Sequence, residues 1–235
     1  NYFINKDYIN AEKYFKRLNK ISRYNLIFDN FMGNILISWI KASQGNKKES
    51  FEVIEKIPKP YRHLTQTQNI FLECYFDSNE TQKSFVNLIE DKEYNFSRYN
   101  FFLINYLISK NKIDEAEKVI QDSRKKYSSN ILLKQTEFFL LNDIKKINNF
   151  FNCKNPNHSI AEFFYVLANL YASEGNYKVS NFYLKISFIL NNNFLSNKAL
   201  LAENLYYQKK YEESKKEYFS LKKIEPIYSW HASKN

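Results

Sequence analysis

Glycine and proline are scarce in this chain, which has three glycines and four prolines among 235 residues. Tight β-turns depend on these two residues, so their scarcity disfavours an all-β fold. With glycine only at Gly33, Gly45 and Gly175, the chain holds no GxGxxG segment and no P-loop. The longest apolar stretches, residues 35–40 and 163–171, fall short of the ~20 residues of a transmembrane helix. We therefore expect no membrane span and no glycine-rich nucleotide site, and no signal peptide is visible.

Residues suited to catalysis or metal binding are also few. The two cysteines, Cys74 and Cys153, lie far apart, and neither belongs to a CxxC or other ligand spacing. We expect buried free thiols, which leave the compartment open between cytoplasm and periplasm. The histidines His63, His158 and His231 have no partner at metal or triad spacing, and we expect them to be exposed. The sequence thus predicts no catalytic residue, metal, cofactor or obligate small molecule, and we do not expect this segment to be an enzyme.

Apolar and aromatic residues are plentiful, with 44% hydrophobic residues, 19 tyrosines and 21 phenylalanines. This content is enough for a folded core. The abundance of Lys, Asn, Ile, Tyr and Phe is typical of an AT-rich genome, and we expect a bacterial source. The net charge of +10 could indicate a nucleic-acid surface. Acidic residues are interspersed, however, as Glu212–Glu213 are between Lys209–Lys210 and Lys215–Lys216, so we interpret the charge as a solvated surface.

An internal repeat of 34 residues is the main feature of the sequence. The segment AEFFYVLANLYASEGNYKVSNFYLKISFILNNN begins at Ala161, and LSNKALLAENLYYQKKYEESKKEYFSLKKIEPI begins 34 residues later at Leu195. At this offset large residues match large ones and small residues match small ones. The matched pairs are Leu167 with Leu201, Ala168 with Ala202, Tyr177 with Tyr211, Ser180 with Ser214, Leu184 with Tyr218, and Leu190 with Ile224.

Each copy contains two apolar stripes of helical period separated by a short polar turn, which predicts two antiparallel helices. The small residues fall where the helix axes must approach closely. One hairpin cannot bury its outer stripe, so the next one must stack on it. A third copy, SRYNFFLINYLISKNKIDEAEKVIQDSRKKYSSN, begins at Ser97 and has Ala116 at the small position of its second helix. We therefore predict an all-α fold.

These units resemble tetratricopeptide repeats (TPRs) in their length, their small residues at the helix crossing, the aromatic residue that opens the second helix, and Pro226 near the end of a unit. The resemblance implies an α-solenoid, a right-handed superhelix of stacked antiparallel hairpins. The segment up to Asn25 matches only the end of a unit, and Tyr228–Asn235 resemble the start of another. We therefore expect a piece of a longer array, truncated at both ends. Within one solenoid over 1–235, the expected units are 1–25 (partial), 26–58, 60–91, 97–130, 129–152, 161–193, 195–226 and 228–235 (partial).

In TPR proteins the first helices of the hairpins line a concave groove in which peptides bind. The resemblance implies these groove residues: Arg98, Phe101, Asn105 and Ser109; Glu162, Tyr165, Asn169 and Ser173 with Ala172; and Glu203, Tyr206 and Tyr207 with Ala199. One group of TPR domains clamps the C-terminal carboxylate of chaperones with Lys, Arg and Asn. Here Asn169 matches one clamp amide, but Tyr165 replaces the expected Lys, which disfavours a chaperone-tail receptor.

The leading functional hypothesis is a non-catalytic scaffold that binds a protein or peptide segment in this groove. An alternative is an RNA-binding helical repeat of the pentatricopeptide kind. No polar residue recurs at a fixed place that could read one base per repeat, which disfavours it. A further alternative is the regulatory array of a larger enzyme whose catalytic domain lies outside residues 1–235. The sequence leaves the identity of the protein or peptide partner open.

The segment Asn152–Ser159, which contains Pro156, is expected to be a loop.

Overall fold

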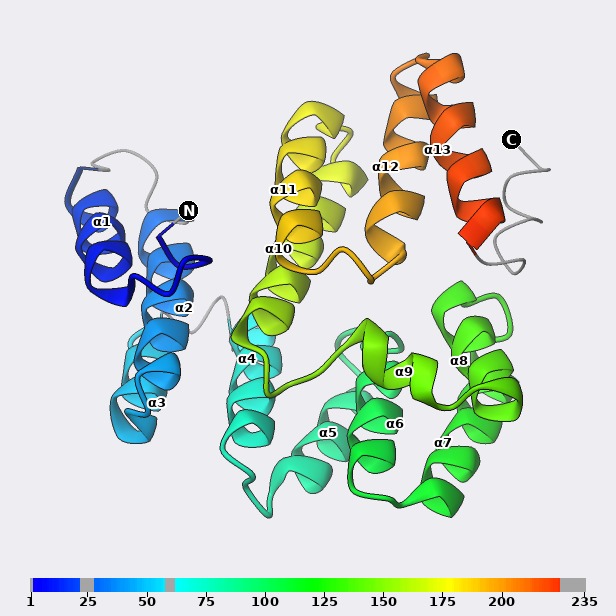
Figure 1. Cartoon of the computed structure of the whole chain (residues 1–235), viewed down its shortest axis with the longest axis horizontal. Helices are drawn as coiled ribbons and strands as arrows, with labels where there is room; N and C mark the ends of the chain where they lie inside the picture. The colour runs from blue at the N-terminus through cyan, green and yellow to red at the C-terminus, as the bar shows by residue number, and fades with distance from the viewer. Residues whose placement is uncertain (1, 22–27, 58–61, 225–235) are drawn as a thin grey trace. The chain divides into compact units, whose positions relative to one another are not determined.

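The computed structural model describes residues 2–21, 28–57 and 62–224, and these ranges contain helices and no strands (Figure 1). The helices pack in consecutive pairs, which is compatible with a helical repeat protein, and the all-α prediction is confirmed. Over the described ranges they are α1 (Tyr8–Ile21), α2 (Phe28–Ser43), α3 (Lys47–Glu55), α4 (Arg62–Tyr75), α5 (Thr81–Ile89), α6 (Tyr99–Ser109), α7 (Ile113–Lys126), α8 (Ile131–Asn142), α9 (Lys145–Phe150), α10 (Pro156–Ser173), α11 (Tyr177–Leu190), α12 (Ser196–Tyr207) and α13 (Tyr211–Ile224).

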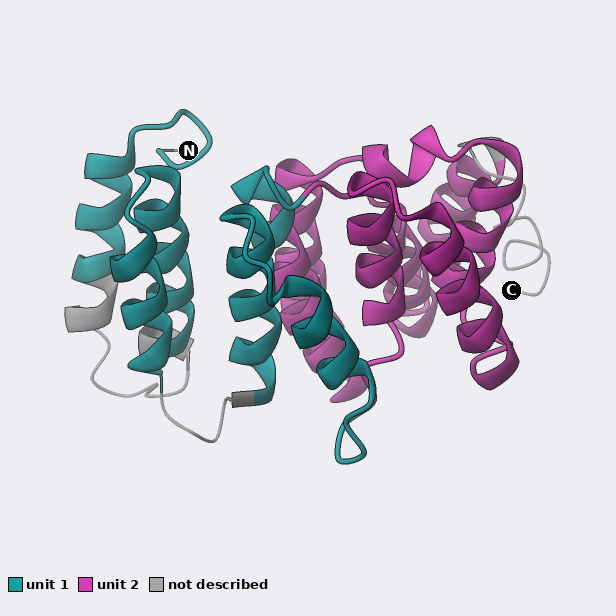
Figure 2. Ribbon diagram, turned by 90° about the horizontal axis from the view of Figure 1, so that it is seen from below, with its two compact units in different colours: residues 1–94, 153–160 teal, residues 95–152, 161–235 magenta. Residues whose placement is uncertain are grey.

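The chain forms two compact units, which Figure 2 colours separately. Unit 1 comprises residues 1–94 and 153–160, and unit 2 comprises residues 95–152 and 161–235. Helices α1 to α5 therefore belong to unit 1, and α6 to α9 with α11 to α13 belong to unit 2. Helix α10 contributes its first residues to unit 1 and the rest to unit 2.

Six turns in the described chain share one geometry. In each, a residue with positive φ donates its N–H to the carbonyl three residues back, and the next residue donates to the carbonyl five residues back. After α2, for example, Gly45 N–H bonds Ala42 O at 2.9 Å and Asn46 N–H bonds Lys41 O at 2.9 Å. This is the Schellman motif, which satisfies the last carbonyls of a helix. The positive-φ residues are Lys6, before α1, and Gly45, Asp77, Asn111, Gly175 and Lys209, between paired helices.

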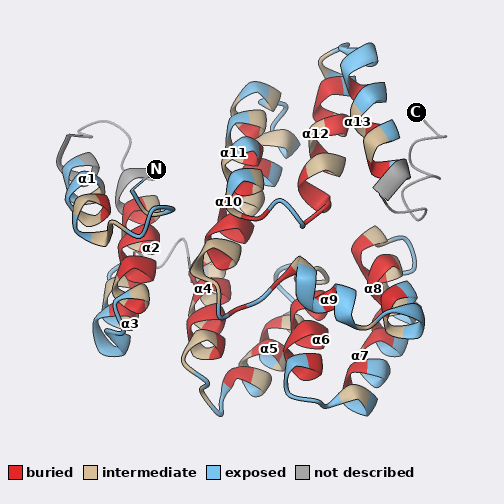
Figure 3. Cartoon of the chain, viewed as in Figure 1, coloured by how far each residue is buried: buried red, intermediate tan, exposed pale blue. Residues whose placement is uncertain are grey.

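Buried residues lie along the helices of unit 2 (Figure 3), and two clusters of them are related by the 34-residue period of the sequence. Ala168 on α10 packs with Leu184 on α11, and the residues 34 positions later, Ala202 on α12 and Tyr218 on α13, pack in a second cluster. Both alanines are fully buried. The Ser214 hydroxyl donates to the Ala202 carbonyl at 2.8 Å, which ties α13 to α12. Small residues thus lie where two helices cross, as the repeat predicted.

Helix α6 is the most deeply buried helix of unit 2 in the described chain, with every residue from Tyr99 to Ile108 buried. Its sequence is apolar on all sides, which is typical of a helix enclosed by others. Its partner α7 is amphipathic instead. It carries Asp114 and Glu115 in its first turn and basic residues in its last turn, where each charge complements the helix dipole.

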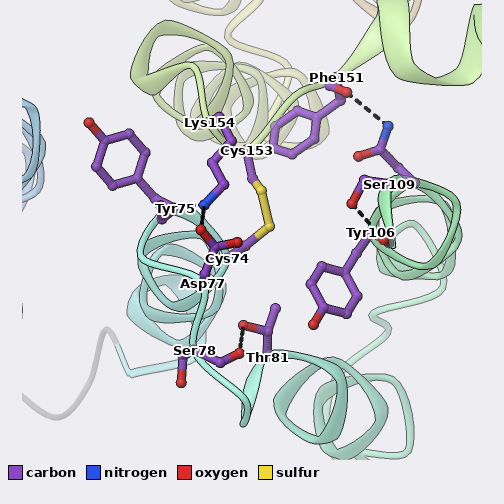
Figure 4. The surroundings of a disulfide bond; sticks show 11 residues. Cys74, Tyr75, Asp77, Ser78, Thr81, Tyr106, Ser109, Phe151, Cys153 and Lys154 are labelled. Carbon is purple, nitrogen blue, oxygen red and sulfur yellow. Dashed lines mark hydrogen bonds and ion pairs between the residues drawn. A yellow bond between two sulfur atoms is a disulfide. The ribbon is translucent and has the colours of Figure 1, made fainter. Parts of the chain in front are cut away.

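Unit 1 contains a disulfide bond between Cys74, near the end of α4, and Cys153, which precedes α10 (Figure 4). The expectation of buried free thiols was wrong, because the fold brings the two Cα atoms to 5.9 Å, within the range that a disulfide spans. Next to it, the Lys154 ammonium forms an ion pair with Asp77 and donates to the Tyr75 carbonyl at 2.8 Å. These contacts hold the segment that begins at Cys153 against the turn between α4 and α5.

The segment Asn152–Ser159 is only partly the expected loop, because α10 begins at Pro156. Proline suits the first position of a helix, where its missing N–H is not needed. The exposure expected for His63 and His158 was also wrong, since both are half-buried and burial lowers the pKa of each. The expectations for Pro226, His231 and Tyr228–Asn235 fall outside the described residues.

Candidate functional site

Unit 2 contains a cavity of about 360 Å³ to which four segments of the chain contribute. The volume lies at the low end of the roughly 300–1,000 Å³ typical of ligand pockets. We call it the charged cavity. Its lining residues are Arg98, which precedes α6; Ser129, Asn130, Ile131 and Leu132 at the start of α8; Tyr165 and Asn169 on α10; and Ser196, Ala199, Leu200 and Glu203 on α12.

The guanidinium of Arg98 is fixed by an ion pair with Glu162 on α10. Its Nε donates to Glu162 Oε1 at 2.7 Å and its Nη2 donates to Oε2 at 2.8 Å, which is the bidentate arrangement that orients both groups. The guanidinium also lies 3.9 Å from the ring centre of Tyr165 and 4.8 Å from that of Phe194. These contacts leave Nη1 as the nitrogen of Arg98 without a hydrogen bond among the described residues.

Burial dominates the electrostatics of this pair. The side chain of Glu162 is 1% exposed, and that of Arg98 is 19% exposed. Burial raises the pKa of the Glu162 carboxyl, and the guanidinium opposes this rise. Burial lowers the pKa of Arg98, but the charge of Glu162 more than compensates and raises it above its ordinary value. The guanidinium is therefore a permanent cation whose charge is neutralised by a single buried carboxylate.

Glu203 on α12 also lines the cavity, and its situation differs from that of Glu162. The residue is half-buried, and burial raises the pKa of its carboxyl. Glu203 forms no ion pair and no hydrogen bond with any described residue, so its charge has no neutralising group there. Burial also raises the pKa of the Tyr165 hydroxyl, which therefore stays a neutral donor and acceptor.

Asn169 and the start of α8 complete the polar part of the lining. Asn169 is exposed on α10 and forms no hydrogen bond among the described residues, so both ends of its amide are available to a ligand. Asn130 instead is the N-cap of α8, and its side chain accepts from the Leu133 N–H at 3.3 Å. The cap uses this amide oxygen within the protein and fixes the first turn of α8 at the cavity.

The structure brings five of the expected groove residues into the charged cavity: Arg98, Tyr165, Asn169, Ala199 and Glu203. Glu162 lies behind them as the partner of Arg98. The other expected residues lie elsewhere. Phe101 and Asn105 are buried in the core of unit 2, and Ser109, Ser173, Tyr206 and Tyr207 are exposed outside the lining of this cavity.

The role of Asn105 is internal. Its amide donates to the carbonyls of Ile147 and Phe151 at 3.1 and 2.8 Å, and it thereby satisfies groups at the end of the short helix α9. Tyr206 and Tyr207 belong to an exposed group of rings, in which Tyr207 stacks on Tyr177 at 5.5 Å. Tyr177 is the first residue of α11, and Tyr206 and Tyr207 are the last two residues of α12.

Sequence reasoning missed the contribution of the segment from Ser129 to Leu132, at the start of α8, which lines the charged cavity. The signal that was present, Asn130 directly before an apolar run, predicts a helix start but not which cavity it faces. A second cavity of unit 2, of about 400 Å³, is mainly apolar and lies between α11, α12 and α13. None of the expected groove residues lines it.

Comparison of the chain with models of known protein families finds no match, and comparison with curated proteins finds none either. Among the described residues, no group of three or more His, Cys, Asp or Glu side chains could hold a metal ion. Nor is any helix in the described ranges long and apolar enough to cross a membrane.

Proposed function

We propose that this chain is a non-catalytic scaffold of the TPR kind, which binds a peptide or protein segment, and that the segment inserts a side chain into the charged cavity. The observation that carries the proposal is the convergence of Arg98, Tyr165, Asn169 and Glu203 in one cavity. These residues come from three different hairpin units, and the resemblance to TPR proteins names each of them as a groove residue. The α-solenoid arrangement belongs to the same proposal.

The way these side chains are held also supports binding. Arg98 is oriented by two hydrogen bonds and by the Tyr165 ring, so the part of the cavity that it lines is fixed before a ligand arrives. Asn169 offers an amide that can donate to and accept from a peptide backbone. A cavity that combines a fixed aromatic ring with polar groups matches the usual composition of a binding hot spot.

A selection of peptides from a displayed random library on the immobilised full chain tests the proposal. We expect selected peptides to bind through the charged cavity, so Asn169→Trp, which fills the cavity with an indole, lowers their affinity at least ten-fold. Leu141→Trp is the matched control, because Leu141 is an exposed residue of α8 outside the cavity. Failure to select any peptide, or peptides that bind equally to Asn169→Trp, would overturn the proposal.

The same assay separates the proposal from RNA binding, which the net charge of +10 would favour. An RNA-binding chain would retain a mixed-sequence RNA with an affinity that falls steeply with salt. We expect the affinity of the chain for the selected peptides to be the same with and without a saturating amount of such RNA. Selection of RNA and of no peptide would favour the alternative.

A further inference from the structure

We propose that the charged cavity takes a positively charged side chain, a lysine ammonium or an arginine guanidinium, of the bound segment, with the Glu203 carboxylate as its counter-ion. The inference rests on the proposed function, because it names the chemistry of the segment that the scaffold binds. It depends on how the three charged groups of the site are paired. Arg98 and Glu162 form an ion pair with each other, whereas Glu203 has no ion pair among the described residues.

The charges of the cavity do not balance. The two oxygens of Glu162 are both occupied by Arg98, at 2.7 and 2.8 Å, so these opposite charges neutralise each other. Glu203 adds one negative charge and has no ion pair in the described chain. The lining residues and Glu162 together therefore carry a net charge of −1, although the whole chain carries +10.

The unpaired carboxylate of Glu203 carries a free-energy cost. A half-buried carboxylate without a partner has lost part of its hydration and gained no interaction in return. Burial raises the pKa of the Glu203 carboxyl for this reason. A ligand cation placed against Glu203 recovers this lost stabilisation, because opposite charges attract more strongly where water is partly excluded. The unliganded chain thus holds an acceptor that a cation can satisfy.

An anionic ligand fits the charged cavity less well than a cation. A carboxylate or phosphate would have to approach Arg98, where only Nη1 has no hydrogen bond among the described residues, because Nε and Nη2 donate to Glu162, whose carboxylate already neutralises the guanidinium. Glu203, which lines the same cavity, would repel it. A cation is instead attracted by Glu203, and the other lining residues include Asn169 and Tyr165, whose side-chain oxygens are hydrogen-bond acceptors. The positive net charge of the chain opposes this only weakly, since charges beyond about 8 Å are screened at physiological salt.

Four peptide libraries test the inference, each of seven residues with random flanks and a fixed central Lys, Arg, Gln or Glu. We expect the full chain to enrich the Lys and Arg libraries at least ten-fold over the Glu library. Glu203→Gln keeps the shape of the side chain and removes its charge, so it should abolish this preference. Glu174→Gln is the control, because Glu174 is an exposed residue of the same unit outside the cavity, and this variant should keep the preference.

The results separate the two proposals. Equal enrichment of all four libraries, or a preference that survives in Glu203→Gln, would overturn the cationic ligand while leaving peptide binding intact. Enrichment of none of the libraries, or enrichment that Asn169→Trp leaves unchanged, would overturn the proposed function itself. If Glu203→Gln fails to fold by circular dichroism, Glu203→Asp keeps the charge and should retain a preference for Lys and Arg. The comparison of libraries on the unmodified chain decides the charge preference without any variant.

Discussion

Arg98 and Glu162 form a buried ion pair that links the start of α6 to α10 within unit 2. Both oxygens of Glu162 are satisfied, and the guanidinium packs against aromatic rings, so the pair recovers much of the cost of its desolvation. The same contacts give the charged cavity a fixed wall. The stability of unit 2 and the geometry of the site therefore depend on one interaction.

Loss of one partner of this ion pair should be costly, because it leaves the other partner buried and unpaired. We expect Arg98→Met to lower the free energy of unfolding by about 3 kcal/mol or more, because it leaves the carboxylate of Glu162 buried without a partner. The double variant Arg98→Met, Glu162→Leu should be destabilised by clearly less than the sum of the single variants. Urea unfolding followed by circular dichroism measures all of these. Additive effects would contradict the ion pair as an energetic unit.

At the residue scale the sequence predicted the site incompletely. The resemblance to TPR proteins implied that Arg98 and Tyr165 are groove residues, and both line the charged cavity. The pairing of Arg98 with Glu162 was not foreseen, because 64 residues separate them and no local pattern encodes such a contact. The same resemblance selected Phe101 and Asn105, which are buried. Helix α6 is apolar on all sides, so its sequence does not distinguish a groove face from a core face.

The turns between paired helices are the most regular elements of the structure. Two of the six positive-φ positions are glycines, Gly45 and Gly175, which adopt this conformation without strain. Asp77, Asn111 and Lys209 adopt the same conformation without being glycine. A residue with a Cβ is strained there, and asparagine and aspartate tolerate it better than lysine does. Here the surrounding helices impose a conformation that the local residue does not prefer.

This strain gives a prediction for Lys209, an exposed residue with φ of 61°. We expect Lys209→Gly to raise the free energy of unfolding by about 0.5–1 kcal/mol, because glycine adopts positive φ without strain. Lys209→Ala is the control for loss of the side chain and should bring no such gain. Chemical denaturation of the three proteins measures the difference, and equal stability of both variants would contradict the explanation.

The reverse change at Gly175 tests the same geometry from the other side. A Cβ added at Gly175 would meet no atom within 4 Å, so packing does not restrict the position. Its φ of 75° does restrict it, and we expect Gly175→Ala to cost about 1 kcal/mol of stability. Unchanged stability in urea unfolding would indicate that the turn relaxes to another conformation.

For the whole molecule, the sequence predicted the helical class and the packing of small residues but not the division of the chain. A period of 34 residues reports contacts that recur from one hairpin to the next, such as those of Ala168 and Ala202. Contacts that occur once leave no periodic signal. The assignment of residues 153–160 to unit 1, far from residues 1–94 in sequence, is of this kind. The disulfide between Cys74 and Cys153 is another.

The disulfide joins residues that are 79 positions apart, and it ties the segment 153–160 to the rest of unit 1. A covalent link over so long a loop restricts the unfolded chain, so we expect Cys74→Ser, Cys153→Ser to lower the free energy of unfolding by about 2–4 kcal/mol. Hydrogen exchange should increase most in residues 153–160, since Lys154 then holds the segment only by its contacts with Asp77 and Tyr75. With reductant present, the unmodified chain should fall to the stability of the variant. A disulfide forms and persists under oxidising conditions, so the free thiols are counted in protein kept oxidised and then denatured. Two free thiols in that sample would contradict the disulfide.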